Sequence, residues 1–121
     1  MNWAVYLITN KINGKGYVGI CNERVKSIFD RFNDHKELAK SGGRYTTHGR
    51  KFPIYAAISK YGEENFSIKY LEVGLDLYDA QEKETEYINE YDTLVKNGYN
   101  LTEGGEEPDW DPDDWEYYSD S

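Results

Sequence analysis

The amino-acid sequence predicts an α/β protein in the broad α+β sense, with a small three-stranded antiparallel sheet flanked by three helices. Three observations predict it: two β-rich segments near the N-terminus, a third such segment later in the chain, and helical periodicity in the stretches between and after them. The chain has 121 residues, about the size of one domain, so a single functional site is expected.

The two N-terminal segments predict a β-hairpin. Residues 4–10 (AVYLITN) and 15–20 (KGYVGI) are rich in β-branched and aromatic side chains. The Asn13-Gly14 pair between them favours a tight turn, because both residue types accept the positive φ angles of hairpin turns. The third strand is expected over residues 65–73.

Two helices are expected between the hairpin and the third strand. The first covers residues from about 24 to 40 and ends before Ser41-Gly42-Gly43. Its apolar side chains recur at helical spacing: Val25, Ile28, Phe29, Phe32 and Ala39. The second is short and runs from Pro53 to Gly62, since proline suits the first helical position and glycine the residue after the last.

Charge divides the chain into three parts. The net charge is -9, yet residues 1–60 hold 11 basic against 4 acidic residues, and residues 61–105 hold 3 against 11. The N-terminal half is therefore expected to face phosphate, with unpatterned surface charge as the alternative. Residues 106–121 hold 8 acidic and no basic residues, which predicts a disordered acidic tail after a domain of residues 1–105.

The composition excludes several classes of protein. No stretch approaches the roughly 18 apolar residues that span a bilayer, and the N-terminus lacks a secretory signal. We therefore expect a soluble, intracellular protein without a membrane partner. Cys21 is the one cysteine, so we interpret it as an ordinary thiol; a zinc site would need Cys21, His35 and His48 at unsuitable spacings.

Glu84 interrupts the apolar stripe of the last predicted helix. This helix is expected over residues 77–91 with Asp76 as its cap, and its stripe contains Leu77, Ala80, Tyr87, Ile88 and Tyr91. The Glu84 carboxylate should therefore point toward the domain, where it must be protonated, paired with a cation or bound to a metal. A structural salt bridge and a metal ligand are both open at this point. Residues 96–100 are expected to turn back against the core.

Arg31 and His35 are four residues apart on the first long helix, so both project from one face. They can converge on a phosphate, because a guanidinium stabilises charge on its oxygens and a histidine can hold or donate a proton. The alternative is an exposed pair with Asp34 or Glu37 as salt-bridge partner.

Tyr6 and Tyr17 lie on the two strands of the predicted hairpin. Ordinary strand packing explains either one alone. Their phenols become useful in a site if they face the side that carries Arg31 and Glu84. An unperturbed phenol titrates near about 10, so a tyrosine that acts as a base at neutral pH needs a neighbouring cation.

Read in order, these residues resemble the GIY-YIG endonuclease family. Five short signatures stand in family order and spacing: Ala4-Val5-Tyr6, Tyr17-Val18-Gly19, Arg31 with His35, Glu84 in ETEYI, and Gly98-Tyr99-Asn100-Leu101. The intervening KYGEENF segment at residues 60–66 agrees, and the match covers about residues 3–105. The likeness is greatest to the catalytic domains of phage-type homing endonucleases, whose ends often read like NGYNLTEGG at residues 97–105.

The resemblance implies hydrolysis of DNA with one divalent cation, Mg²⁺ or Mn²⁺, held by Glu84 and water. It implies that Tyr6 helps to deprotonate the attacking water and that Tyr17 orients the nucleophile or the phosphate. Arg31 would stabilise the transition state, and His35 would support the phosphate or shuttle a proton. The residues expected to contact phosphate or DNA are Lys11, Lys15, Gly19 and Asn100, and Asn100 is also expected to brace the site.

Two departures from the family pattern leave further functions open. Ala4 replaces the glycine of the first signature, and an acidic segment stands where relatives commonly append a linker and DNA-reading modules. The chain could act alone with low specificity or with a protein partner that confers specificity. The alternatives are a catalytically idle binding module and an acidic DNA mimic. The acidic tail is expected to compete with DNA for the basic face.

Overall fold

The computed structural model describes residues 1–41 and 52–101. The predicted domain boundary at residue 105, the acidic tail and His48 lie outside the described residues. No helix within the described ranges is both long and apolar enough to cross a membrane.

The sheet has the predicted three antiparallel strands. β1 (Trp3–Asn10) lies in the centre, between β2 (Gly16–Asn22) and β3 (Phe66–Leu75). The hairpin turn is closed by two backbone hydrogen bonds: the Asn10 N–H donates to the Lys15 carbonyl at 2.9 Å, and the Gly14 N–H donates to the Asn10 carbonyl at 2.8 Å. Gly14 has a φ of 79°, which explains the glycine at this position.

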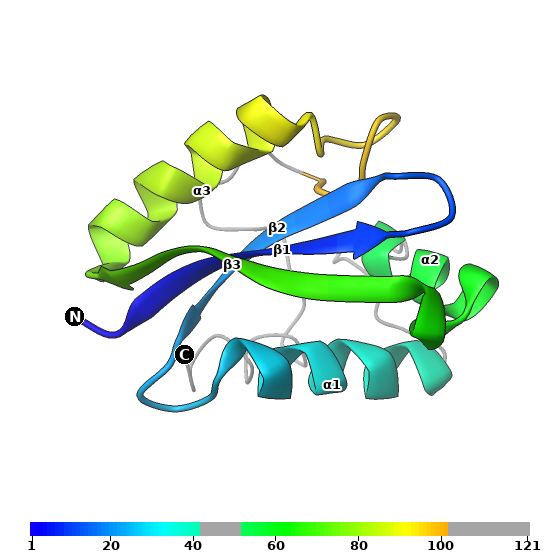
Figure 1. The fold of residues 1–121 in the computed structure, drawn as a ribbon, viewed down its shortest axis with the longest axis horizontal. Helices are drawn as coiled ribbons and strands as arrows, with labels where there is room; N and C mark the ends of the chain where they lie inside the picture. Colours follow the sequence, from blue (N-terminus) through cyan, green and yellow to red (C-terminus); the bar gives the residue numbers. More distant parts are fainter. Residues whose placement is uncertain (42–51, 102–121) are drawn as a thin grey trace.

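Helices cover both faces of the sheet, as Figure 1 shows. α1 (Ile28–Lys40) covers one face, and α3 (Leu77–Tyr91) covers the other. α2 (Pro53–Tyr61) lies at the end of the sheet beside α1 and is followed by the short 3-10 turn η1 (Glu63–Asn65). The predicted fold class, with three helices around a three-stranded sheet, is confirmed.

The first helix begins later than the sequence predicted. Ser27 is its N-cap, and the Asp30 N–H donates to the Ser27 hydroxyl at 3.1 Å. Val25 therefore lies in the turn before the helix and is 52% exposed. Phe29 is 55% exposed, although its ring packs edge-on against Tyr70 of β3 with ring centroids 6.1 Å apart. The prediction that both residues belong to the buried stripe was wrong.

The last helix has the predicted bounds and the predicted cap. The Asp76 carboxylate accepts a hydrogen bond from the Asp79 N–H at 2.7 Å. Ala80 and Ile88 are buried, but Leu77 and Tyr91 are largely exposed because they are the first and last residues of the helix. The stripe that faces the sheet is therefore shorter than predicted.

Alternate residues of the same strands enter two separate cores. Toward α3, the core is aliphatic and contains Val5, Leu7, Val18 and Ile88. Toward α1 and α2, the core contains Tyr6, Ile8, Cys21 and apolar side chains of both helices. This alternation follows from the two-residue period of a strand.

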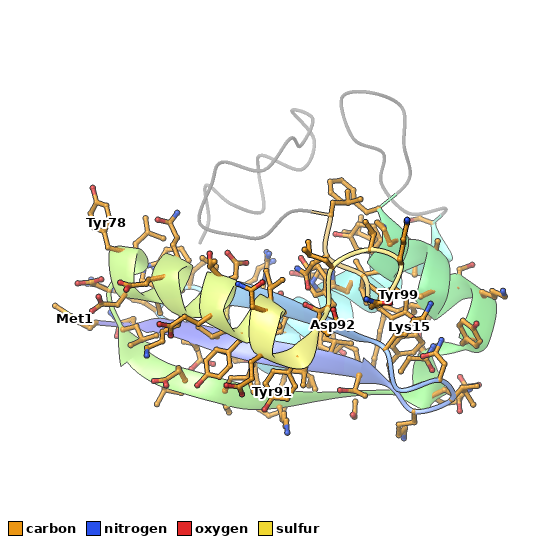
Figure 2. The ribbon with its side chains drawn as sticks, turned by 90° about the horizontal axis from the view of Figure 1, so that it is seen from above. Met1, Lys15, Tyr78, Tyr91, Asp92 and Tyr99 are labelled. Carbon is orange, nitrogen blue, oxygen red and sulfur yellow. The ribbon has the colours of Figure 1, made fainter. Side chains whose placement is uncertain are left out.

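The residues after α3 pack along the free edge of β2. The Tyr99 N–H donates to the Gly16 carbonyl at 2.9 Å, and the Tyr99 hydroxyl accepts from the Asn10 side chain at 3.0 Å. Figure 2 shows Tyr99 and Lys15 together at this end of the sheet. The predicted turn against the core is confirmed, since Tyr99 and Asn100 are both buried.

Candidate active site

Tyr6 projects from β1 toward α1, and its phenol lies over Gly19. Gly19 is the β2 partner of Tyr6 in the hairpin register. A Cβ at Gly19 would collide with the ring and the hydroxyl of Tyr6. Gly19 therefore provides the space into which the phenol fits, and only 1% of Tyr6 is exposed.

His35 is the residue on which the aromatic side chains meet. Its Nε2 lies 3.2 Å from the Tyr6 hydroxyl in a buried hydrogen bond. The Tyr17 ring packs edge-on against the imidazole, with centroids 5.6 Å apart and planes at 73°. Tyr6 and Tyr17 also lie close to each other, with centroids 6.5 Å apart. The two phenols therefore face the same side of the sheet.

Arg31 lies one turn before His35 on α1. Arg31 is 5% exposed and His35 is 4% exposed, so the alternative of a solvated helical pair is excluded. Asp34, which that alternative offered as a partner, pairs instead with Lys26 at 2.8 Å. The sequence placed both residues on one helix face, and the structure shows that this face is buried against the sheet.

Burial and Arg31 together determine the charge of His35. Desolvation is the larger cause and the Arg31 guanidinium the smaller one, and they lower the pKa of His35 from 6.5 to about 3. The imidazole is therefore neutral at neutral pH and has one nitrogen able to accept a proton. Its Nδ1 makes no hydrogen bond with the part of the chain that the structure describes.

Cys21 lies on the same face but is chemically quiet. The thiol is buried and forms no disulfide. Burial raises its pKa to about 11, although Arg31 acts in the opposite direction. The thiol is thus protonated at neutral pH, which fits the prediction of an ordinary cysteine.

Glu84 lies on the other helical layer. It is half-buried on α3, one turn after the buried Ala80 and one turn before the buried Ile88. Ile88 packs with Val18 of β2, and α3 lies against β2 and β1. Glu84 therefore lies on the side of α3 that also carries Ala80 and Ile88, and α3 covers the sheet face opposite α1. β2, against which α3 packs, is an edge strand of the sheet.

The single carboxylate of Glu84 fits a hydrated hard cation better than a metal ion bound by several protein side chains. Among residues 1–41 and 52–101, no three His, Cys, Asp or Glu side chains form a group that could hold a metal. Mg²⁺ commonly keeps several water ligands and takes one or two carboxylates together with substrate phosphates. A single half-buried carboxylate at Glu84 is a donor set of that kind.

Both the oxygen and the nitrogen of the Asn100 amide make hydrogen bonds inside the domain. Its Oδ1 accepts a hydrogen bond from the Val18 N–H at 2.8 Å, and its Nδ2 donates to the Val18 carbonyl at 2.9 Å. The side chain thus replaces a neighbouring strand at the free edge of β2. These contacts fit the predicted bracing role, and the phosphate contact that was also predicted stays a prediction.

The other predicted phosphate contacts differ in position. Lys11 is exposed in the hairpin turn, and Lys15 is half-buried beside it. Both stay candidates for contact with the DNA backbone. Gly19 is buried beneath Tyr6, so the structure explains the glycine by the phenol above it rather than by a phosphate.

Tyr55 is a member of the cluster that the sequence did not reveal. It projects from α2, and its ring centroid lies 5.4 Å from that of His35. The chain has 12 tyrosines, and Tyr55 falls at an ordinary helical spacing. No local signal distinguishes it, because its contact with His35 depends on how α1 and α2 pack.

Comparison with known proteins identifies the family. Residues 2–100 match the family model described as the GIY-YIG catalytic domain. The chain is 37% identical over 101 residues to a protein of Enterobacteria phage T4 named "Putative endonuclease segE". That match covers 84% of this chain and 41% of the phage protein, so the chain spans less than half of this relative's length.

Solved structures show the same fold. A mutant form of the catalytic domain of the intron endonuclease I-TevI superposes with a TM-score of 0.67 at 24% identity, over 86% of this chain and 97% of that one. The catalytic domain of the homing endonuclease I-TevI gives a TM-score of 0.65 at 24% identity, over 83% and 98%.

Proposed function

The chain belongs to the GIY-YIG catalytic domain family, and we propose that it is a metal-dependent endonuclease that hydrolyses phosphodiester bonds of DNA. The observation that carries the proposal is the buried hydrogen bond between the Tyr6 hydroxyl and His35 Nε2, one helical turn from Arg31. A phenol, a neutral imidazole and a guanidinium together can move a proton and stabilise an anion.

We assign the proton transfer to Tyr6 and His35. As water attacks the phosphorus, the Tyr6 oxygen takes a proton from the water and passes its own proton to His35 Nε2. The Tyr6 hydroxyl lies within hydrogen-bond reach of this nitrogen, and His35 is neutral and able to accept. The bond from phosphorus to the leaving oxygen breaks, and that oxygen is protonated from solvent.

Arg31 makes this transfer dependent on the substrate. In the free protein, the guanidinium contributes to the low pKa of His35. A bound phosphate brings negative charge to Arg31 and offsets its effect on the imidazole. His35 therefore becomes a stronger base when the substrate is present, and Arg31 also stabilises the charge that develops on the non-bridging oxygens.

Glu84 is the residue that would hold the divalent cation, Mg²⁺ or Mn²⁺. The cation, when bound, supplies charge stabilisation at the phosphate and the leaving oxygen. Tyr17, packed against His35 and Tyr6, orients the nucleophile or the phosphate. The scissile phosphate would lie near β2, because Tyr17 projects from this strand and α3 packs against it.

The same residues suggest how sequence preference arises. The side chains of the proposed site act on a phosphate and a water, and these groups are identical at every nucleotide. We therefore propose that base recognition comes from outside this site, for example from a protein partner that confers specificity.

A plasmid cleavage assay tests the proposal. We expect the full chain to nick or linearise supercoiled DNA with Mg²⁺ or Mn²⁺ and to lose this activity in EDTA or as Glu84→Gln. Glu82→Gln is the matched control, since Glu82 lies on the same helix but is exposed. Intact plasmid in all conditions, with salt-sensitive DNA binding by the wild type, would instead support a catalytically idle binding module.

A further inference from the structure

The imidazole of His35 lies between rings from three different elements. Tyr6 comes from β1, Tyr17 from β2 and Tyr55 from α2. The Tyr55 ring is tilted by 37° against the imidazole, with ring centroids 5.4 Å apart. Phe52, just before α2, packs edge-on against Tyr55 with centroids 6.0 Å apart.

We propose that Tyr55 is a positioning residue, whose ring holds the His35 imidazole in line with the Tyr6 hydroxyl and shields it from water. The catalytic consequence rests on the endonuclease function proposed above. The structural part of the proposal, that Tyr55 fixes and covers His35, is independent of any activity.

Hydrogen bonds leave the imidazole plane underdetermined. Within the described residues, His35 is hydrogen-bonded at Nε2 to Tyr6, and its Nδ1 has no such bond. One hydrogen bond fixes the position of one ring atom but allows the ring to rotate about it. Contacts with neighbouring rings must therefore set the plane of the imidazole. Tyr17 of β2 and Tyr55 of α2 supply such contacts.

Tyr55 is not needed to attach α2 to the domain. The buried residues of this helix are Ile54, Ala57 and Ile58, and they belong to the core beneath α1 and α2. Tyr55 is only half-buried. Its removal should therefore leave α2 in place while it opens one side of His35 to solvent.

The charged and titratable groups around His35 make the effect measurable. They are Arg31 on α1 and the phenols of Tyr6, Tyr17 and Tyr55. Burial is the main reason for the low pKa of His35, and Arg31 adds to it. Loss of Tyr55 admits water without moving Arg31, so the pKa should rise toward the ordinary value of a histidine, about 6.5.

Proton NMR of the full chain tests the structural part. The chain has two histidines, so the His35 ring signals can be assigned by their loss in His35→Gln. We expect the titration midpoint of His35 to rise by about one pH unit or more in Tyr55→Ala and to stay unchanged in Tyr55→Phe, which keeps the ring. Tyr61→Ala is the matched control, because Tyr61 lies on the same helix, is half-buried and packs against the same core.

An unchanged His35 midpoint in a folded Tyr55→Ala variant would overturn the proposal. So would an equal shift in Tyr61→Ala, because a general loosening of α2 would then be the cause. Circular dichroism establishes that each variant is folded.

Cleavage kinetics test the catalytic part. We expect kcat to fall about tenfold in Tyr55→Ala with KM within about twofold, and Tyr55→Phe to retain wild-type kcat, because alignment acts on the proton transfer. Wild-type kcat in Tyr55→Ala despite a shifted His35 midpoint would overturn the catalytic role. A shifted midpoint in a protein whose wild type never cleaves DNA would refute the proposed function and still support the positioning of His35.

Discussion

The two faces of the sheet are built from neighbouring residues yet have different tasks. Toward α3, Val5, Val18 and Ile88 form an aliphatic layer. Toward α1, Tyr6 and Tyr17 meet a buried arginine and a buried histidine. Val5 and Tyr6 are adjacent, as are Tyr17 and Val18. On each strand, one of the two neighbours therefore packs in the aliphatic core and the other lies in the candidate site.

The comparison of the two faces shows that buried ionisable side chains gather on the face covered by α1. The α1 face holds Arg31 and His35 at about 5% exposure, at a cost in desolvation. The α3 face supplies apolar burial that offsets this cost. We therefore expect substitutions of Arg31 and its neighbours on the α1 face to reduce activity first, and substitutions in the aliphatic layer beneath α3 to reduce stability first.

Substitution of Arg31 should have the largest effect. Arg31→Ala removes the cation of the α1 face, and we expect kcat to fall by about 10³, or roughly 4 kcal/mol of barrier, as for loss of a preorganised charge-stabilising donor. Arg31→Lys should recover little, because an ammonium cannot reproduce the planar guanidinium fork. Single-turnover cleavage with Mg²⁺ measures it. Near-normal rates in folded Arg31→Ala would show that the α1 face is not the reactive one.

Ile88→Ala tests the opposite face. Ile88 is 1% exposed between α3 and the sheet, and truncation should lower the free energy of unfolding by about 3 kcal/mol. The cleavage rate well below the new melting temperature should stay within about twofold of wild type, because no group of the α1 face is removed. Urea denaturation and cleavage assays measure the two quantities. A large loss of activity with unchanged stability would contradict the division of tasks.

Gly19→Ala should have a smaller effect, on both stability and cleavage activity. The added Cβ would collide with the Tyr6 phenol, so the ring must move away from its present place. We expect a loss of about 1–3 kcal/mol in stability, the usual range for overpacking. Cleavage should fall as well, since the Tyr6 hydroxyl no longer lies 3.2 Å from His35 Nε2. Wild-type kinetics in this variant would show that the position of the phenol is unimportant.

A further effect is the contribution of His35 to stability at acidic pH. The native state keeps His35 neutral down to about pH 3, whereas the unfolded chain protonates it near 6.5. Between these values the unfolded state binds the extra proton, so stability falls with decreasing pH by at most about 1.4 kcal/mol per unit. We expect the melting temperature of His35→Gln to fall less than that of wild type between pH 6.5 and 4. Parallel curves would mean that His35 protonates with an ordinary pKa in the native state.

Much of the fold was predictable because its signals are local. The Asn13-Gly14 turn, Pro53 and Gly62 at the ends of α2 and Asp76 before α3 all lie where the sequence placed them. The start of α1 was missed because Val25 and Phe29 continue the helical spacing, whereas Ser27 determines the N-terminus. Capping by a single hydroxyl is a weaker sequence signal than five apolar residues in register.

The sequence by itself determined which residues can form the site. The helix period places Arg31 and His35 on a common face, whereas the common face of Tyr6 and Tyr17 also depends on the register of the hairpin. Only the tertiary structure decided which helix covers which face. It places Tyr55 against His35, Gly19 beneath Tyr6 and the Asn100 amide on Val18. The physical reason is that periodicity is a property of one segment, whereas a contact between side chains depends on the packing of two.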